Sequence, residues 1–349
     1  MIARRISVID FFSGCGGTSL GLEQAGMRIA GGVDNDPDSA EAFQNNFPGS
    51  RFLETDIRAL PSEALTPLLP RGPLLFAGCA PCQPFSNQNK TRSVADPRRG
   101  LLNEFTRMVV AHRPEYVVVE NVPGMQRVGR DGPLAGFGSD LERAGYSCRT
   151  SILRALDYGV PQERRRLVVV GSLCGPARLP LATHGTGAHP VATVRQTIGD
   201  LPPLDDGGVD PLDPDHAAMA LSPLNRARIR ATPEGGDRRD WPAELRLACH
   251  KTYTGHSDVY GRMGWDRPAS GLTTRCVSYS NGRFGHPEQH RAITVREAAC
   301  LQTFPTTFQF TGTLTSRARQ VGNAVPPLMA QRIGEALVEA SSARMQDST

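Results

Sequence analysis

The chain has 349 residues, of which 39% are hydrophobic and 21% are charged, an ordinary balance for a globular protein with a large core and a smaller lobe. No apolar run approaches the ~20 residues that span a membrane, and a strand-like run, not a signal peptide, follows Arg4 and Arg5. The eight cysteines lie singly except for Cys79 and Cys82, which favours a reducing cytoplasm. The net charge of +4 permits a polyanionic partner without requiring one.

Short β-branched and apolar runs alternate with helical segments in the amino-terminal part of the chain. The strand-like runs cover residues 6–12, 29–34, 51–56, 74–78 and 116–121. This alternation predicts βαβ units on a parallel sheet. Two more runs, 149–155 and 166–172, are joined by a turn that is too short for a crossover helix, so we expect them to pair antiparallel at the edge of the sheet.

The composition changes after residue 172, where Pro, Gly and His become frequent. Residues 200–215 contain six Asp and no Lys or Arg, and this segment predicts a loop. Residues 226–251 hold six Arg and one Lys against four acidic residues, which fits either a basic binding surface or a solvated face. Behind Pro326 and Pro327, apolar residues recur at near-helical spacing and predict a closing amphipathic helix over 325–340.

The first predicted strand leads into a turn rich in glycine, formed by Gly14, Gly16 and Gly17, just before a predicted helix. Backbone can approach a ligand at such a turn, and Asp34 ends the second strand where a carboxylate accepts hydrogen bonds from ribose hydroxyls. Together these features indicate a nucleoside cofactor. Asp56 could accept from the adenine amino group and Phe12 could offer a face to the ring. Alternatively, Asp56 is a helix cap and Phe12 belongs to the core.

A single cysteine follows the fourth predicted strand. In Pro81-Cys82-Gln83-Pro84, the prolines make a rigid loop that presents the Cys82 thiol at the edge where doubly wound folds bind ligands. The alternatives are a buried structural cysteine, a zinc ligand, or half of a redox pair with Cys79. No second Cys pair has zinc spacing, and three preceding strands with a glycine turn are not a thioredoxin-like context. We therefore take Cys82 as the candidate nucleophile.

Further polar side chains are predicted to reach the same region. Glu120 ends the fifth strand, so its carboxyl lies on the same sheet edge as Cys82 and suits general acid or base work. Gln162, Arg164 and Arg166 alternate, so at strand spacing they project from one face toward that region. Alternatively, these arginines only form a solvent-exposed edge of the sheet.

The ordered set of motifs resembles the DNA cytosine-C5 methyltransferase family, of the bacterial restriction-modification type, from about Val8 to Val338. The motifs are FSGCGG, Asp34, Asp56, PCQPFS, ENVPG, QERRR, RPASGLTTR from Arg267 to Arg275, and QVGNAVPP from Gln320 to Pro327. Gly271 is one departure, because family members usually have Thr there. The resemblance implies an α/β fold with a seven-stranded, Rossmann-like S-adenosylmethionine-dependent methyltransferase sheet and a smaller, irregular target-recognition domain.

The resemblance implies methyl transfer from S-adenosylmethionine to C5 of a flipped-out cytosine in a specific double-stranded DNA sequence, through a covalent Cys82–C6 adduct. Cys82, Glu120, Arg164 and Arg166 form the catalytic set, in which Glu120 acts on N3 and Arg164 binds O2; no metal is needed. The cofactor residues are Phe12, Gly14, Gly16, Gly17, Asp34, Asp56 and Asn323. The candidate DNA-binding residues are Gln83, Ser86, Arg98, Gln162, Arg238, Arg239, Lys251 and Arg262.

The resemblance also implies a domain order and partners. We expect a catalytic and cofactor-binding domain over 1–172, a target-recognition domain over 173–265, and over 266–349 the remainder of the small domain and a helix returning to the catalytic domain. The expected partner is double-stranded DNA, bound by a monomer at the nucleoid of a bacterial cytoplasm and not at a membrane. A cognate restriction endonuclease is a further candidate partner.

Two other functions were weighed against this one. A tRNA cytosine-C5 methyltransferase is disfavoured because that branch typically replaces the Gln83-Pro84 pair that follows Cys82 here. A catalytically silent DNA-binding regulator is disfavoured because Cys82, Glu120 and Arg164 are all retained. The target sequence cannot be predicted, since base contacts depend on loop geometry.

Overall fold

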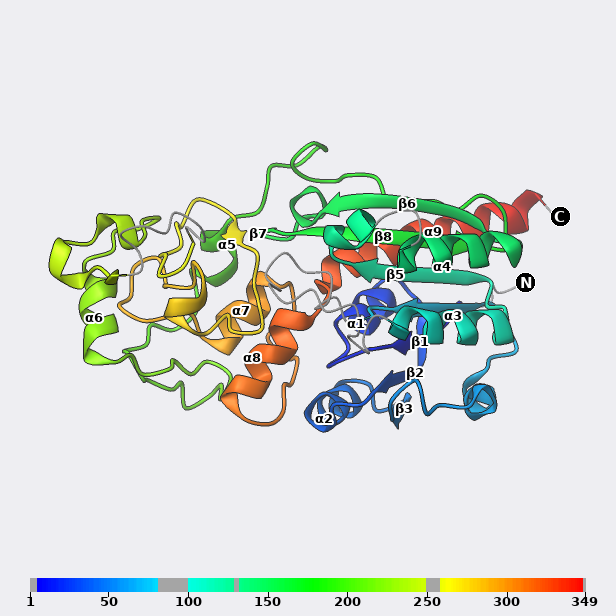
Figure 1. Cartoon of the computed structure of the whole chain (residues 1–349), viewed down its shortest axis with the longest axis horizontal. Helices are drawn as coiled ribbons and strands as arrows, with labels where there is room; N and C mark the ends of the chain where they lie inside the picture. Colours follow the sequence, from blue (N-terminus) through cyan, green and yellow to red (C-terminus); the bar gives the residue numbers. More distant parts are fainter. Residues whose placement is uncertain (1–4, 81–99, 129–131, 249–257, 348–349) are drawn as a thin grey trace. The chain divides into compact units, whose positions relative to one another are not determined.

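The computed structural model describes residues 5–80, 100–128, 132–248 and 258–347 (Figure 1). The chain divides into two compact units. The sheet unit comprises residues 1–154, 165–182 and 325–349, and the second unit comprises residues 155–164 and 183–324. As expected, residues 266–324 group with the small domain and the closing helix returns to the sheet unit. The expected boundary at 172 differs, because residues 155–164 group with the second unit and residues 173–182 with the sheet unit.

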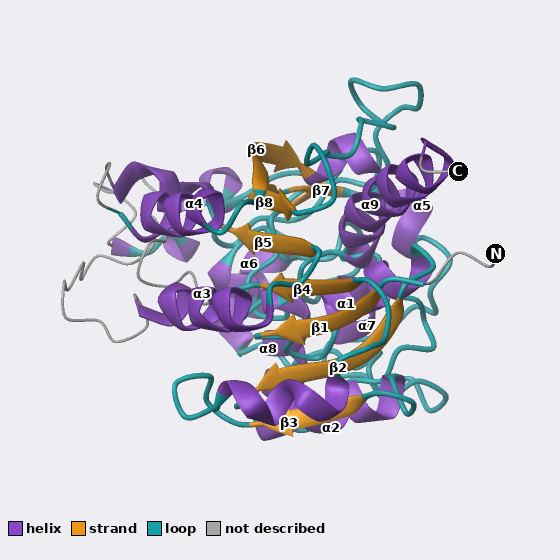
Figure 2. Cartoon of the chain, turned by 90° about the vertical axis from the view of Figure 1, so that its right-hand side faces the viewer, coloured by secondary structure: helices purple, strands orange, loops and turns teal. Residues whose placement is uncertain are grey.

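The sheet unit is built on a seven-stranded sheet with the order β3-β2-β1-β4-β5-β8-β6 (Figure 2). Its strands are β1 (Ser7–Phe11), β2 (Arg28–Asp34), β3 (Arg51–Glu54), β4 (Leu74–Gly78), β5 (Tyr116–Asn121), β6 (Ser147–Arg154) and β8 (Arg165–Ser172). The first five are parallel, whereas β8 pairs antiparallel with both β5 and β6. The predicted α/β class and the predicted antiparallel pair are therefore confirmed, with β6 as the edge strand.

Burial along the strands follows their position in the sheet. Every residue of the central strands β4 and β5 is buried, as expected where helices cover both faces, while the edge strand β6 is mostly exposed. Phe11 of β1 packs edge-on against Phe76 and Phe105, with ring centroids 5.0 and 5.3 Å apart. This aromatic cluster anchors the core of the sheet unit.

Helices cover both faces of this sheet (Figure 2). They are α1 (Gly17–Gln24), α2 (Pro37–Asn46), α3 (Leu101–His112), α4 (Pro133–Arg143) and α9 (Pro327–Asp347), with the 3-10 helices η1 (Ser62–Leu68) and η4 (Pro123–Val128). On one face α3 packs against α4, and on the other α1 packs against α9. The predicted closing helix is confirmed as α9. No helix among the described residues is long and apolar enough to cross a membrane.

The second unit is irregular, with short elements. These are α5 (Val194–Ile198), α6 (Pro223–Arg230), α7 (Val295–Leu301), α8 (Leu314–Asn323), the 3-10 helices η5 (Ala155–Tyr158), η6 (Arg238–Asp240), η7 (Ala243–Leu245) and η9 (Tyr279–Asn281), and the parallel strands β7 (Gln162–Glu163) and β9 (Ala269–Ser270). The predicted loop over 200–215 is confirmed. A small core forms around Trp241, Tyr279 and Ile229.

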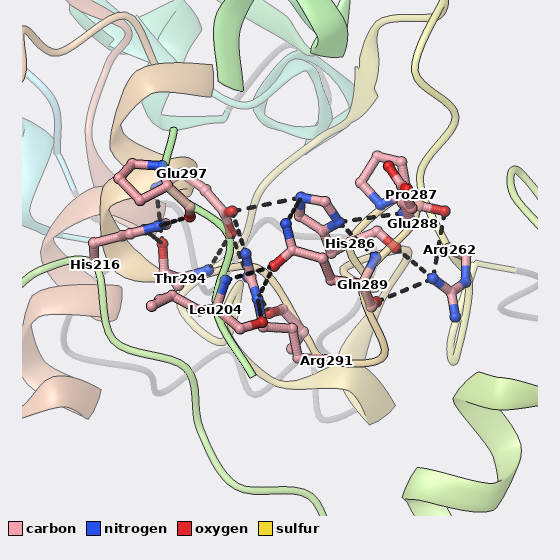
Figure 3. A network of polar contacts seen from close by, with 12 residues as sticks. Leu204, His216, Arg262, His286, Pro287, Glu288, Gln289, Arg291, Thr294 and Glu297 are labelled. Atoms are coloured by element: carbon pink, nitrogen blue, oxygen red, sulfur yellow. Dashed lines mark hydrogen bonds and ion pairs between the residues drawn. The ribbon is translucent and has the colours of Figure 1, made fainter. Parts of the chain in front are cut away.

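A buried polar network holds this unit together (Figure 3). Arg291, which has no exposed surface, makes two hydrogen bonds of 2.8 and 2.7 Å to the carboxylate of Glu297. Glu297 also caps α7 by accepting from the backbone N–H of Thr294. Burial lowers the pKa of the neighbouring His286 to about 4, so this imidazole is neutral near pH 7. These buried hydrogen bonds stabilise a unit that has little regular secondary structure.

Candidate functional site

The turn between β1 and α1 has a backbone that only a few residue types adopt readily. Gly14 and Gly16 have positive φ of 52° and 99°, and so does Phe12, at 55°. A Cβ on Gly16 would lie 2.4 Å from the ring of Phe47, so both conformation and packing require glycine there. Helix α1 begins at Gly17, and no side chain caps it. The turn therefore presents backbone N–H groups at a helix start, which suits a polar or anionic ligand.

Asp34 joins the end of β2 to this turn. Its Oδ2 accepts a hydrogen bond of 2.9 Å from the backbone N–H of Gly14, and its Oδ1 accepts from Asn35 and Asp36. Burial raises the pKa of Asp34. Oδ2 retains one acceptor position, so the side chain can also accept from a hydroxyl. Acceptor and backbone donors thus meet in the arrangement that a nucleoside cofactor needs, and these residues fit one.

The two remaining cofactor candidates in the sheet unit, Phe12 and Asp56, already contact other residues of the protein. Phe12 packs against the core of the sheet unit. Asp56 lies two residues beyond the end of β3 at Glu54, and the Arg58 side chain donates to it from Nε at 2.9 Å. That hydrogen bond lowers the pKa of Asp56. Asp56 therefore remains a carboxylate that shares its oxygens with Arg58.

Asp10 was missed by the sequence analysis. It lies in β1 beside the glycine turn and is only 1% exposed, and the Ser19 hydroxyl donates to its Oδ2 at 2.7 Å. Burial raises its pKa to about 7. The signal that could have found it is an acidic residue inside an otherwise apolar strand, since such a group is costly to bury as an ion.

Glu120 sits at the carboxyl end of β5, with both carboxylate oxygens held. Arg166 of β8 forms an ion pair with Oε1 through its Nε. The thiol of Cys79, just past β4, donates to Oε2 at 2.9 Å. Asn121 ties the same two strand ends together by donating to the carbonyl of Ala80 at 2.9 Å. The Glu120 carboxyl is therefore fixed in orientation at the sheet edge where Cys82 follows in sequence.

A small apolar cavity is lined by this carboxyl and by residues of helix α1. Its lining residues are Thr18, Leu22, Gly78, Val118, Glu120, Val325, Ala330 and Ile333. Among the described residues, Glu120 is the one charged group on its wall. The first turn of the helix that follows the glycines and the candidate acid–base group thus border the same space within the sheet unit.

Gln162, Arg164 and Arg166 do not share one strand face, so that expectation is wrong. Strand β7 ends at Glu163 and β8 begins at Arg165, and the break places Gln162 and Arg164 in the second unit. Arg164 is buried there and donates to the carbonyls of Leu272 at 3.0 Å and Ala324 at 3.2 Å. Of the two arginines, the one that meets Glu120 is Arg166.

Five of the predicted site residues, Cys82, Gln83, Ser86, Arg98 and Lys251, lie outside the described residues. Asn323 is exposed at the end of α8. Arg238 and Arg262 are buried, at 8% and 2% exposure, and Arg262 donates to backbone carbonyls, including that of Ile229 at 2.6 Å. Arg262 thus holds segments of the second unit together, and burial leaves both side chains poorly placed to reach DNA.

Arg239 is different, because its side chain is 74% exposed. Asp237 accepts from its Nε at 2.9 Å and from its Nη2 at 2.6 Å. Asp237 itself is buried and also meets Arg283, and hydrogen bonds from the two arginines lower its pKa to about 2 against the effect of burial. A cleft of about 710 Å³ lies beside this pair and includes Arg267 in its lining. Arg239 is thus an exposed cation in a fixed orientation.

Comparison with known proteins gives consistent matches over most of the chain. The family model for C-5 cytosine-specific DNA methylase matches residues 6–339. The Type II methylase M.HgiDII of Herpetosiphon aurantiacus is 40% identical over 95% of this chain and 94% of that protein. The Type II methyltransferase M1.HphI of Haemophilus parahaemolyticus is 36% identical over 96% of this chain and 87% of that protein. A prophage-encoded E. coli protein, described as a candidate DNA modification methyltransferase, has a similar fold, with a TM-score of 0.74 and 23% identity over 97% of this chain and 99% of that chain.

Proposed function

Because this chain belongs to the C-5 cytosine-specific DNA methylase family, we propose that it methylates a flipped-out cytosine in a specific double-stranded DNA sequence through a Cys82–C6 adduct. The family makes it a DNA (cytosine-5-)-methyltransferase. The observation that best supports the proposed chemistry is the fixed Glu120 carboxyl at the sheet edge where Cys82 follows.

Cytosine C5 is a poor nucleophile, so the ring must first become enamine-like. Addition of the Cys82 thiolate at C6 does this, because it breaks the C5–C6 double bond and pushes electron density toward C5 and N3. A free thiol has a pKa of ~8.5, so attack at neutral pH requires that the site favour the thiolate. Elimination of Cys82, after the C5 proton leaves to a base not yet identified, restores the aromatic ring.

Glu120 is proposed to hold or protonate N3, which withdraws electron density from C6 during attack. Its two donors, Arg166 and Cys79, fix the orientation of the carboxylate. We assign the contact with O2 to Arg166 instead of Arg164, because Arg166 is the arginine paired with Glu120. A cation there stabilises the negative charge that develops on the exocyclic oxygen O2.

The proposed cofactor residues are Phe12, Gly14, Gly16, Gly17, Asp34, Asp56 and Asn323. When bound, S-adenosylmethionine supplies an electrophilic methyl group on its sulfonium. In our proposal the backbone at the start of α1 binds the polar end of this cofactor and Asp34 accepts from its ribose hydroxyls. Because Thr18 and Glu120 line one small apolar cavity, we propose that the methyl donor lies close to the Glu120 carboxyl.

The proposed partner is double-stranded DNA. Extrusion of the base costs a few kcal/mol, which contacts to phosphates and to the orphaned partner base must offset. Sequence discrimination is assigned mainly to residues 173–265, with Arg239 as the exposed candidate reader. We also propose that the enzyme works as a monomer in the cytoplasm at the nucleoid. The Type II names of its bacterial relatives support a cognate restriction endonuclease as a further partner.

The proposed function is tested by incubating the purified enzyme with tritiated S-adenosylmethionine and a random-sequence duplex library. Label incorporated into DNA, followed by bisulfite sequencing, should give protected cytosines within one recurring sequence. A parallel reaction with bulk tRNA should incorporate no label. Incorporation into tRNA alone would overturn the DNA assignment in favour of the RNA alternative.

A further inference from the structure

We propose that Arg164 is a positioning residue for the methyl donor: it fixes the carboxyl-terminal turn of α8 so that Asn323 can meet the cofactor. It does so without touching the cytosine. The proposal rests on the proposed function, because Asn323 is placed in the cofactor site only by the family's last motif. Arg164 then acts through Asn323 and is not itself a catalytic residue.

The Arg164 guanidinium donates to backbone carbonyls at the end of α8. The last carbonyls of a helix have no partner within the helix, and α8 ends at Asn323. Arg164 donates to the carbonyl of Gly322 at 3.5 Å and to the carbonyl of Ala324 at 3.2 Å. Its two acceptors therefore flank Asn323 directly on both sides.

A second buried side chain supports the same turn. Gln302, which has no exposed surface, donates from Nε2 to the carbonyls of Val321 at 2.8 Å and Ala324 at 3.1 Å. Gln162 orients it by donating to its Oε1 at 2.8 Å. Helices commonly end in a left-handed glycine, but the residue after α8 is Ala324 in an extended conformation. Side chains from distant segments therefore replace the usual cap.

The backbone around this turn is held closely. A Cβ on Gly322 would lie 2.1 Å from the carbonyl oxygen of Thr273, so only glycine permits this approach. Arg164 also donates to the carbonyl of Leu272 at 3.0 Å, which fastens the neighbouring segment to the same guanidinium. Val321 and Gly322 are buried, while Asn323 is exposed. The support thus fixes the main chain and leaves the Asn323 side chain projecting.

An arginine suits this task for physical reasons. Its planar guanidinium offers several donors in fixed directions, and a cation is favoured beside the negative end of a helix dipole. Lysine keeps the charge but cannot reproduce the fork. Arg164→Lys should therefore weaken the support partially, and Gln302→Met should remove two donors while nearly keeping the side-chain volume.

The test measures cofactor affinity and the rate of methyl transfer separately. We expect Arg164→Lys and Gln302→Met each to raise both the calorimetric Kd and the KM for S-adenosylmethionine about five- to tenfold, because donors to the turn are lost. At saturating cofactor, kcat and the Kd for DNA should stay within about threefold of wild type. Arg166→Lys is the matched contrast, and it should lower kcat with an unchanged Kd for the cofactor.

Two results would overturn the proposal. One is a large fall in kcat for Arg164→Lys at saturating cofactor with an unchanged Kd, which would place Arg164 on the ring. The other is an unchanged cofactor Kd in Gln302→Met, which decides the matter even if the Arg164 variant does not fold. If the wild-type enzyme bound no S-adenosylmethionine, the proposed function itself would be refuted, and this proposal with it.

Discussion

Glu120 and Arg166 form an ion pair across two neighbouring antiparallel strands, β5 and β8, with the carboxylate only 7% exposed. The Cys79 thiol donates to the other oxygen of the same carboxylate. A buried carboxylate with an arginine on one side and a thiol on the other has one fixed orientation. Because Arg166 holds the carboxylate that we propose as the acid–base group, it is also the arginine that we assign to the cytosine.

Glu120→Gln should reduce the rate of methyl transfer by ~10²-fold or more, because the amide neither protonates N3 nor pairs as an anion with Arg166. Single-turnover rates with pre-bound DNA measure this step, and DNA affinity should change only a few fold. Glu54→Gln, an exposed carboxyl at the end of β3, is the matched control and should behave as wild type. A Glu120 variant that lost only affinity would reassign this residue to DNA positioning.

Cys82→Ser should abolish methyl transfer, since a hydroxyl is far less acidic than a thiol although nearly isosteric with it. The Kd for S-adenosylmethionine, measured by calorimetry, should remain within a few fold of wild type. Cys148→Ser, a half-buried thiol in β6, controls for the loss of a cysteine and should retain activity. Near-normal turnover by Cys82→Ser would refute the covalent mechanism.

Asp10 predicts a pH dependence of stability. Burial raises its folded-state pKa from the usual 3.8 to about 7, so between these pH values the folded protein holds a proton that the unfolded chain has released. Stabilisation by the neutral form is therefore complete below about pH 4 and is lost as the pH rises to about 7. Asp10→Asn is neutral throughout and should lack this loss.

Thermal unfolding of the wild type and of Asp10→Asn between pH 4 and pH 8 tests the predicted direction of this pH dependence. The variant should gain stability relative to wild type as the pH rises through this window, and the difference should level off above it. The Asn side chain keeps an acceptor for the Ser19 hydroxyl, so the comparison isolates the charge. Parallel stability profiles for the two proteins would show that Asp10 does not titrate as described.

Arg239→Ala should relax sequence preference at one base pair if the guanidinium, held side-on by Asp237, contacts a guanine edge. The loss should be ~1–3 kcal/mol at that position, whereas loss of a phosphate contact would weaken binding to all sequences alike. Competition binding with duplexes varied at each target position measures the difference. Arg195→Ala removes another exposed arginine paired with an aspartate, and it should leave the preference unchanged.

Much of the sheet unit could be predicted because its strands are apolar runs that need only local sequence to identify. All seven strands of the sheet were expected, and β4 and β5 were expected with their exact residues. The glycine turn and Asp34 were also placed together correctly, since the carboxyl ends of neighbouring parallel strands meet at one edge.

What the sequence could not predict depends on partners that are distant along the chain. Arg164 and Arg166 look equivalent as alternating residues, but the strand breaks between β7 and β8 and sends them into different units. Arg262 looks like a surface cation, yet carbonyls from Ile229 and from residues 286–289 surround it. Only the fold shows which arginines donate to backbone and which remain exposed.

The central claim is that the Cys82 sulfur adds to cytosine C6, and a trapping measurement tests it most directly. A duplex with 5-fluorocytosine at the target position is incubated with enzyme and S-adenosylmethionine, then denatured, digested with protease and nuclease, and analysed by mass spectrometry. Because fluorine cannot leave as a proton does, elimination should stall after methyl transfer. We predict a cofactor-dependent adduct of methylated fluorocytosine on the peptide that contains Cys82. Turnover of the normal duplex with no such adduct, or an adduct on another residue, would contradict covalent addition by Cys82.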